Sequence, residues 1–186
     1  MKVTIYDSNP GGGGLWQGFL KTSWRVGCWL QKAVGAIDDY YGATTWDEAR
    51  AWLVSKNTPI TELQYWGHGS PGAIWMTEKM ITVFDWLSLK PLLAPDAILW
   101  FRVCDAFQGP WGQHFSKVLA DGLGCTIAGH TRIVGLWQGG LYTRKPNTVP
   151  SWPASEGGEP SWLREDFKFW NKHTVFCLRS SFPKDW

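Results

Sequence analysis

Two apolar stretches that end on reactive side chains constrain the fold more than any other feature of this sequence. Residues 63–68 read Leu-Gln-Tyr-Trp-Gly-His, and residues 97–104 read Ala-Ile-Leu-Trp-Phe-Arg-Val-Cys. Each apolar run has the length of a buried strand. If the two strands are parallel neighbours, His68 and Cys104 emerge at the same edge of one sheet. Open α/β folds bind their ligands at that edge.

Strand and helix patterns alternate along the rest of the chain, which predicts an α/β fold with a mainly parallel sheet. A capping box, Thr45-Trp46-Asp47-Glu48, indicates the start of a helix. The remaining expected elements are strands at residues 2–7, 125–131 and 174–182, helices at 15–37, 82–89, 110–124 and 163–171, and a β-hairpin at 73–82.

The length of 186 residues predicts a single domain that spans residues 1–186. One segment, residues 136–162, is rich in Trp, Pro and Gly and has no period, so we expect a long loop there. Loops of that length in a compact domain are usually functional or disordered. The chain has 15 tryptophans, which indicate a heavily aromatic core, an adhesive surface, or both.

Charge and cysteine usage narrow the class of protein. A net charge of +2 is too small to predict a basic surface for nucleic acid. No apolar stretch approaches the length of a membrane span. The N-terminus reads as a strand and lacks the apolar core of a secretory signal. Its four cysteines are scattered, with no CxxC pair. We therefore expect a cytoplasmic protein with free thiols that binds neither nucleic acid nor membrane. Its oligomeric state is not predicted.

The two strand ends supply the parts of a nucleophilic site. A thiol attacks a carbonyl as its thiolate, so Cys104 needs a base beside it, and His68 provides an imidazole. Gly69 follows directly and lets the backbone come close to a substrate, with its N–H directed at a developing oxyanion. The N–H of Cys104 is the natural second donor. Such a site needs no cofactor and no metal.

At these residues the chain resembles the caspase–gingipain–legumain group of cysteine peptidases (clan CD), in which one apolar strand ends in His-Gly and a later one in the catalytic cysteine. The matching elements are residues 64–69 and 99–104, and the His-Gly-Ser-Pro-Gly stretch is similar to that of uncharacterised bacterial members. The resemblance covers residues 1–135 in strand and helix order.

The resemblance implies a three-layer caspase-like sandwich and a protein or peptide substrate. It makes Cys104 the nucleophile, His68 the general base, and the amides of Gly69 and Cys104 the oxyanion hole. Val103 stands where the group usually has Ala, and the Gln-Ala-Cys-x-Gly signature of caspases is absent. Substrate specificity therefore does not carry over.

Four residues near the two strand ends are candidates for substrate contact. Arg102 shares a strand face with Cys104, so its guanidinium is placed to bind an acidic side chain, or to form a buried ion pair with Asp7, Asp105 or Glu48. His130 and Thr131 end the next strand and are expected near the same edge, as pocket residues or as part of the core. The candidates for substrate binding are thus Arg102, Asp105, His130 and Thr131.

Other interpretations of the same residues stay open. Cys104 and His68 are also compatible with a structural role in an inactive relative, which would act as a protein- or glycan-binding module through Trp137, Trp152 and Trp162. A zinc site made by His68, Cys104 and His130 lacks compact ligand spacing. Ser70 lacks the Gly that a serine nucleophile elbow needs, and the glycine run at residues 11–14 lacks the Gly-Lys-Ser/Thr of a phosphate-binding loop.

Overall fold

A six-stranded sheet, in the order β10-β8-β7-β3-β1-β2, forms the centre of the protein. The computed structural model describes residues 1–11, 15–157, 173–179 and 182–183. Five strands run parallel and β10 runs antiparallel at one edge. The strands are β1 (Lys2–Asp7), β2 (Asp39–Ala43), β3 (Ile60–Trp66), β7 (Leu93–Arg102), β8 (Thr126–His130) and β10 (Leu141–Arg144).

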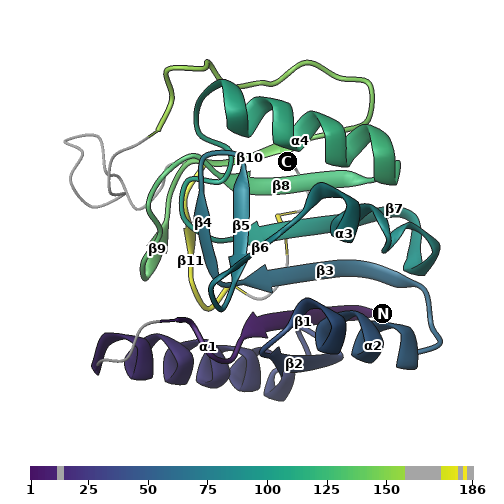
Figure 1. The fold of residues 1–186 in the computed structure, drawn as a ribbon, viewed down its shortest axis with the longest axis vertical. Coiled ribbons are helices and arrows are strands. Elements are labelled where there is room, and N and C mark those ends of the chain that lie inside the picture. The colour runs from purple at the N-terminus through teal and green to yellow at the C-terminus, as the bar shows by residue number, and fades with distance from the viewer. Residues whose placement is uncertain (12–14, 158–172, 180–181, 184–186) are drawn as a thin grey trace.

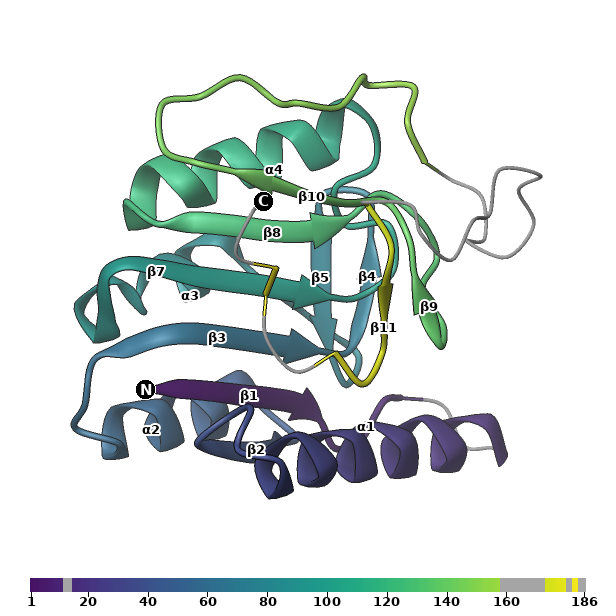
Figure 2. The same ribbon diagram turned by 180° about the vertical axis from the view of Figure 1, so that it is seen from behind.

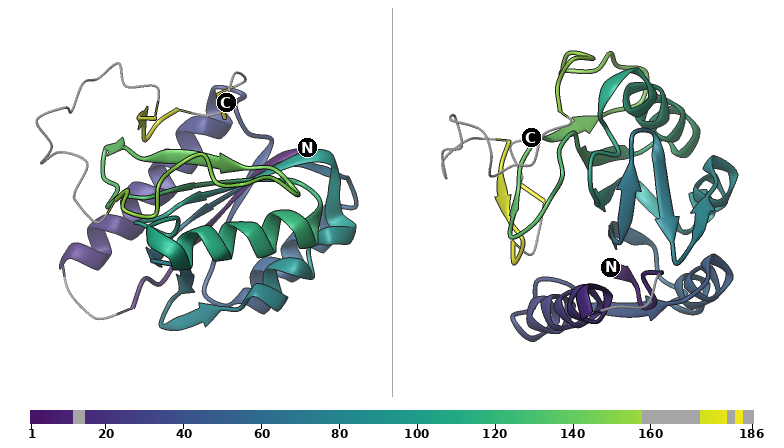
Figure 3. Two further views of the ribbon diagram at one scale, coloured as in Figure 1. Left: turned by 90° about the horizontal axis from the view of Figure 1, so that it is seen from above. Right: turned by 60° about the vertical axis from the view of Figure 1, so that its left-hand side comes forward.

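Helices cover both faces of this sheet (Figures 1 and 3). One face carries α2 (Trp46–Ser55), α3 (Val83–Leu87) and α4 (Gly109–Leu123), and a short 3₁₀ helix, η1 (Lys90–Leu92), leads into β7. The other face carries α1 (Leu15–Ala33) and the C-terminal segment with β11 (Val175–Phe176). The predicted α/β sandwich, with a mainly parallel sheet flanked by helices, is confirmed.

The helix boundaries follow from local signals in the sequence. The hydroxyl of Thr45 accepts a hydrogen bond from the Glu48 amide at 3.2 Å, as the predicted cap requires. Thr82 forms a complete capping box at the start of α3. Gly124 ends α4 in the left-handed conformation, with φ of 73°, which a residue without Cβ adopts at little cost.

Three parts of the chain differ from expectation. Strand β2 was not predicted, and α1 ends at Ala33 rather than near residue 37. Residues 136–162 are not a continuous loop, because they contain β9 (Trp137–Gln138) and β10. The closing strand is only β11, which pairs with β9 and not with the main sheet. The helix expected at residues 163–171 and the glycines at 12–14 lie outside the described residues.

The tryptophans divide between core and surface. Trp86 of α3 is fully buried, with its ring centroid 4.6 Å from that of Trp46 on α2 and 4.8 Å from that of Phe101 on β7. Trp100 is fully buried on the opposite face of the sheet. In contrast, Trp29 is 56% exposed and Trp111 is 73% exposed. The indoles therefore provide both a dense aromatic core and an apolar surface.

Arg102, the last residue of β7, makes five side-chain hydrogen bonds in the interior. Its guanidinium donates to the side-chain oxygens of Gln138 and Gln64 at 2.9 and 3.1 Å. It also donates to three carbonyl oxygens of the C-terminal segment, those of Phe176, Cys177 and Arg179. All five N–H groups are thereby used.

Two indoles enclose the same guanidinium. The Arg102 Cζ lies 4.5 Å from the ring centroid of Trp66 and 4.3 Å from that of Trp100. Burial lowers the pKa of Arg102 to about 9, so the group still carries its charge at neutral pH. The arrangement ties β3, β7, β9 and the C-terminal segment together around one cation.

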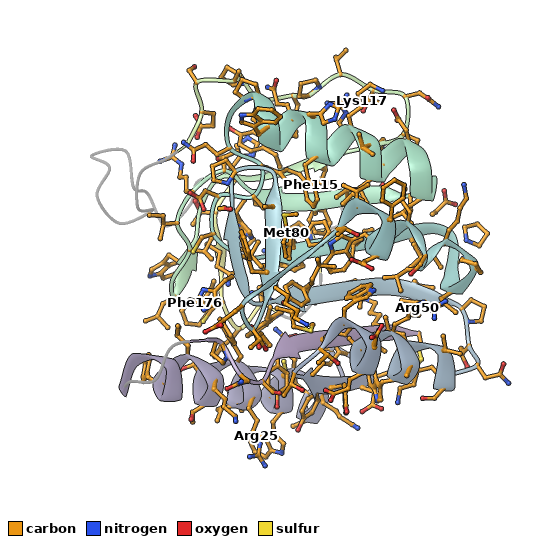
Figure 4. The ribbon with its side chains drawn as sticks, viewed as in Figure 1. Arg25, Arg50, Met80, Phe115, Lys117 and Phe176 are labelled. Carbon is orange, nitrogen blue, oxygen red and sulfur yellow. The ribbon has the colours of Figure 1, made fainter. Side chains whose placement is uncertain are left out.

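Replacement of Arg102 tests this central role. We expect Arg102→Lys to lower the free energy of unfolding by about 2–4 kcal/mol, because an ammonium has three donors and leaves buried oxygens unpaired. The measurement is urea unfolding followed by tryptophan fluorescence. The control is Arg50→Lys on the exposed side of α2 (Figure 4), where the change should stay within about 0.5 kcal/mol. Equal effects at both positions would contradict the assignment.

Candidate functional site

The two motifs lie at the ends of adjacent parallel strands, as predicted. In the register of β3 and β7, Trp66 is opposite Arg102, and His68 and Cys104 each lie two residues beyond that pair. His68 opens β4 (His68–Ser70), which forms a small antiparallel sheet with β5 (Ala73–Met76) and β6 (Lys79–Ile81). All of the parallel strands end at this side of the main sheet, where β4, β5, β9 and β11 gather (Figure 2).

Gly69 brings the two strand ends into direct contact. A Cβ at this position would overlap the carbonyl oxygen of Cys104 and the side chain of Val103. The backbone that follows His68 therefore lies directly against the backbone of the cysteine. We predicted that the missing side chain of this glycine makes room for a substrate. In the structure, the backbone of Cys104 fills that space instead.

The loop after Cys104 is held from both sides. The amide of Asp105 donates to the carbonyl of Arg132 at 2.9 Å, and the amide of Phe107 donates to the carbonyl of His130 at 2.9 Å. On the other side, the amide of Gly72 donates to the carbonyl of Ala106 at 3.1 Å. The cysteine thus sits at the start of a loop that is hydrogen-bonded to both flanking segments.

The Cys104 thiol is half-buried. Its Sγ lies 4.0 Å from the carbonyl oxygen of Val134, its hydrogen-bond acceptor. Burial raises the pKa of this thiol above its usual value, and the nearby carboxyl of Asp105 adds to the increase. Burial also raises the pKa of Asp105. Among the described residues, backbone hydrogen bonds favour the thiolate, but burial outweighs them.

The His68 imidazole is half-buried at the same edge. Its ring lies edge-on to Trp24 of α1, with centroids 5.6 Å apart and an interplanar angle of 72°. Within the described residues, no hydrogen bond joins this imidazole to the Cys104 thiol. Catalytic hydrogen bonds often form only when substrate is bound, so the predicted pairing of His68 with Cys104 stays a prediction. Trp24 was not predicted here, since only the fold brings α1 to His68.

Arg102 does not face this site. Its donors are all used within the protein, so the structure gives no support to its predicted substrate contact. The expected ion pair is wrong as well. Among the candidate partners, Asp7 accepts from the amides of Asn9 and Thr77, and Glu48 accepts from Thr44. Within the described residues, the guanidinium of Arg102 donates to neutral oxygens and lies over two indole faces instead.

His130 and Thr131 belong to the core and not to a pocket wall. His130 is fully buried, with Nδ1 3.0 Å from the carbonyl oxygen of Gly139 and Nε2 accepting from the Trp100 indole at 3.4 Å. Burial lowers the pKa of His130 to about 3, so the ring is neutral. Thr131 is also buried, and its amide donates to the carbonyl of Gly140 at 2.9 Å.

The structure also bears on the predicted zinc site, the serine nucleophile and the tryptophan surface. Both nitrogens of His130 are occupied, and the described residues contain no group of three His, Cys, Asp or Glu side chains able to hold a metal ion. Ser70 accepts a hydrogen bond from the Trp75 indole at 3.2 Å. Trp152 is buried, stacked on Phe107, and donates to a backbone carbonyl, so it cannot present a recognition surface. Trp162 lies outside the described residues.

Comparison of the chain with protein-family models, curated proteins and solved structures found no match. Within the described residues, no helix combines the length and apolar character needed to cross a membrane. All four cysteines, Cys28, Cys104, Cys125 and Cys177, are free thiols.

The contact at Gly69 generates a steric prediction. We expect Gly69→Ala to lower the free energy of unfolding by about 1–3 kcal/mol, because the new methyl group overlaps the backbone of Cys104. The control is Gly18→Ala in α1, where a Cβ meets nothing within 4 Å and should be neutral or stabilising. Denaturant unfolding measures both. A neutral Gly69→Ala variant would show that the two strand ends do not touch.

The buried His130 generates a pH prediction. Its folded pKa is below the unfolded value, so the unfolded chain binds more protons and stability falls with pH below about 6.5. Protonation linked to His130 alone should lower the free energy of unfolding by about 2 kcal/mol between pH 7.5 and pH 5. In the His130→Gln variant, the free energy of unfolding should no longer show this decrease between the two pH values. The control variant His114→Gln, at an exposed histidine, should still show it. Urea unfolding at the two pH values makes the comparison, and identical slopes in all three proteins would contradict it.

Proposed function

We propose that this protein is a cysteine endopeptidase with a caspase-like domain, in which Cys104 is the nucleophile and His68 the general base. The observation that carries the proposal is the contact of the two strand ends at Gly69, which fixes imidazole and thiol at one edge of the sheet. The α/β sandwich supports the resemblance to the caspase–gingipain–legumain group, because a parallel sheet is what brings those motifs together.

The proposed reaction follows acyl transfer to sulfur. The Cys104 Sγ bonds to the peptide carbonyl carbon as its proton passes to His68, and the oxyanion lies toward the amides of Gly69 and Cys104. The C–N bond then breaks, and His68 returns the proton to the leaving amine. Water, activated by the same imidazole, hydrolyses the thioester and restores the thiol. The substrate is a protein or peptide chain.

The raised pKa of Cys104 makes the base essential to this proposal. A half-buried thiol with a raised pKa is a weak nucleophile at neutral pH unless a base takes its proton in the attack. His68 and Cys104 must therefore close upon each other when substrate binds. Asp105, half-buried beside the thiol, is the acidic residue that we assign to the substrate-binding edge.

Labelling with a thiol-directed peptidyl electrophile tests the dyad. We expect selective reaction at Cys104 at pH 7.5, and a rate that falls by about 100-fold or more in His68→Ala. The variant should recover labelling only at alkaline pH, because its thiol has a raised pKa and no base. The exposed His114→Ala serves as the matched control. Labelling of Cys104 no faster than Cys177, which is also half-buried, would refute the peptidase proposal.

The alternative is an inactive caspase-like domain that binds a protein or glycan. One observation favours it, a hollow of about 290 Å³ between α3 and α4 with Phe84 and Trp111 strongly exposed at its margin. Peptide labelling separates the two functions, since a binding domain has no need of a reactive thiol. We also propose a cytoplasmic location, with which the four free thiols are compatible.

A further inference from the structure

The backbone of His68 is held firmly, whereas its ring can still rotate. His68 pairs with Trp75 in the hairpin of β4 and β5, and the next residue, Gly69, lies against the backbone of Cys104. These two attachments fix the point from which the imidazole projects. They leave free the two torsions of the side chain, which decide where the ring points. A general base acts only when its nitrogen lies within reach of the proton that it takes.

The Trp24 indole is the one ring that contacts this imidazole within the described residues. The two centroids lie 5.6 Å apart, at an interplanar angle of 72°. In the same part of the chain, no hydrogen bond or ion pair reaches the His68 side chain. In nucleophile–base pairs a third group orients the base, and in a serine triad that group is a carboxylate. Here the group that meets the base is an indole.

Helix α1 holds Trp24 on its inner face. Trp24 lies three and four residues before Gly27 and Cys28, a spacing that places all three on one side of the helix. Cys28 is fully buried, and a Cβ at Gly27 would overlap the ring of Trp66, so the helix backbone lies directly on that indole. Trp24 is itself half-buried and packs against Tyr6 and Trp66. Close packing therefore restricts the position of its indole.

The direction of α1 brings Trp24 to the level of His68. The helix runs back from the edge where the parallel strands end (Figure 2), so residues before Gly27 lie toward that edge. From Gly27 to Trp24 the helix advances by about 4.5 Å. From Trp66, which Gly27 contacts, two residues of extended chain reach His68 and span about 6.6 Å. Helix and strand thus arrive at the edge together, which is why the two rings meet.

We propose that Trp24 is the positioning residue for His68, because its indole limits rotation of the imidazole away from Cys104. The strand that leads to His68, β3, lies between β7 and β1. Cys104 follows β7, whereas α1 packs on β1 and β2. Trp24 therefore reaches the imidazole from the β1 side, and the cysteine lies on the β7 side. An indole in that place opposes a turn of the ring toward β1.

The inference rests on the proposed peptidase function and names the residue that supports its base. Trp24 takes no proton and forms no bond to the substrate. It acts through His68, by restricting the ring to orientations from which a nitrogen reaches the thiol when substrate binds. A displacement of about 1 Å at a reacting group lowers a rate by about 100-fold, so loss of the indole should be visible in the attack step.

Labelling of Cys104 with the peptidyl electrophile measures the effect on attack. We expect Trp24→Leu and Trp24→Met to lower the maximal labelling rate by about tenfold or more, with the half-saturating probe concentration unchanged. Both residues fill the apolar space without a ring. Trp24→Phe should recover most of the rate, because a phenyl ring retains the edge contact. The control is Trp29→Leu on the outward side of α1, where the indole is 56% exposed and the rate should not change. Urea unfolding verifies that each variant is folded.

Histidine NMR tests the ring contact without any reaction. The chain has four histidines, and His68→Gln identifies the signals of that ring. Trp24→Leu should move those signals by removing the ring current of the indole, and Trp29→Leu should leave them in place. Unmoved signals, or an unchanged labelling rate in the ring-free variants where His68→Ala labels slowly, would overturn the positioning role alone. An unchanged rate in His68→Ala would overturn the peptidase proposal, and the role of Trp24 with it.

Discussion

The buried charge of Arg102 is the interaction on which the rest of the structure depends. A guanidinium without a carboxylate partner is costly in the interior unless every donor finds an oxygen. Here two glutamine side chains and three backbone carbonyls supply the oxygens, and two indoles cover both planar faces. Those carbonyls belong to the C-terminal segment, so the cation holds a part of the chain with little regular structure against the sheet.

This use of Arg102 determines what remains for chemistry at the sheet edge. Because its donors all point into the core, Arg102 does not stabilise a thiolate at Cys104, and burial raises the pKa of that thiol. In the peptidase that we propose, activation therefore depends on His68, whose neighbour Gly69 lies against the cysteine backbone. The imidazole of His68 in turn lies edge-on to Trp24 of α1.

Local signals predicted the parts of the fold that depend on a few neighbouring residues. The strands that end near His68 and Cys104, the Thr45 cap and the end of α4 at Gly124 all follow from adjacent side chains. The role of Arg102 was missed because its partners lie 36 to 77 residues away in sequence. The sequence left His130 open between pocket and core, because β10, which pairs with the strand of His130, lies in a segment predicted as loop.

Helix α1 links the candidate site to the buried cation in physical terms. Its inner side carries Trp24, whose ring centroid lies 5.6 Å from that of His68. The same side buries Cys28 and Gln31, and at Gly27 the helix backbone lies directly on the ring of Trp66. Trp66 in turn covers the guanidinium of Arg102, with the Arg102 Cζ 4.5 Å from its ring centroid. The helix that contacts His68 therefore rests on the same indole that encloses the buried charge, so a change at Arg102 would reach His68 through Trp66 and α1.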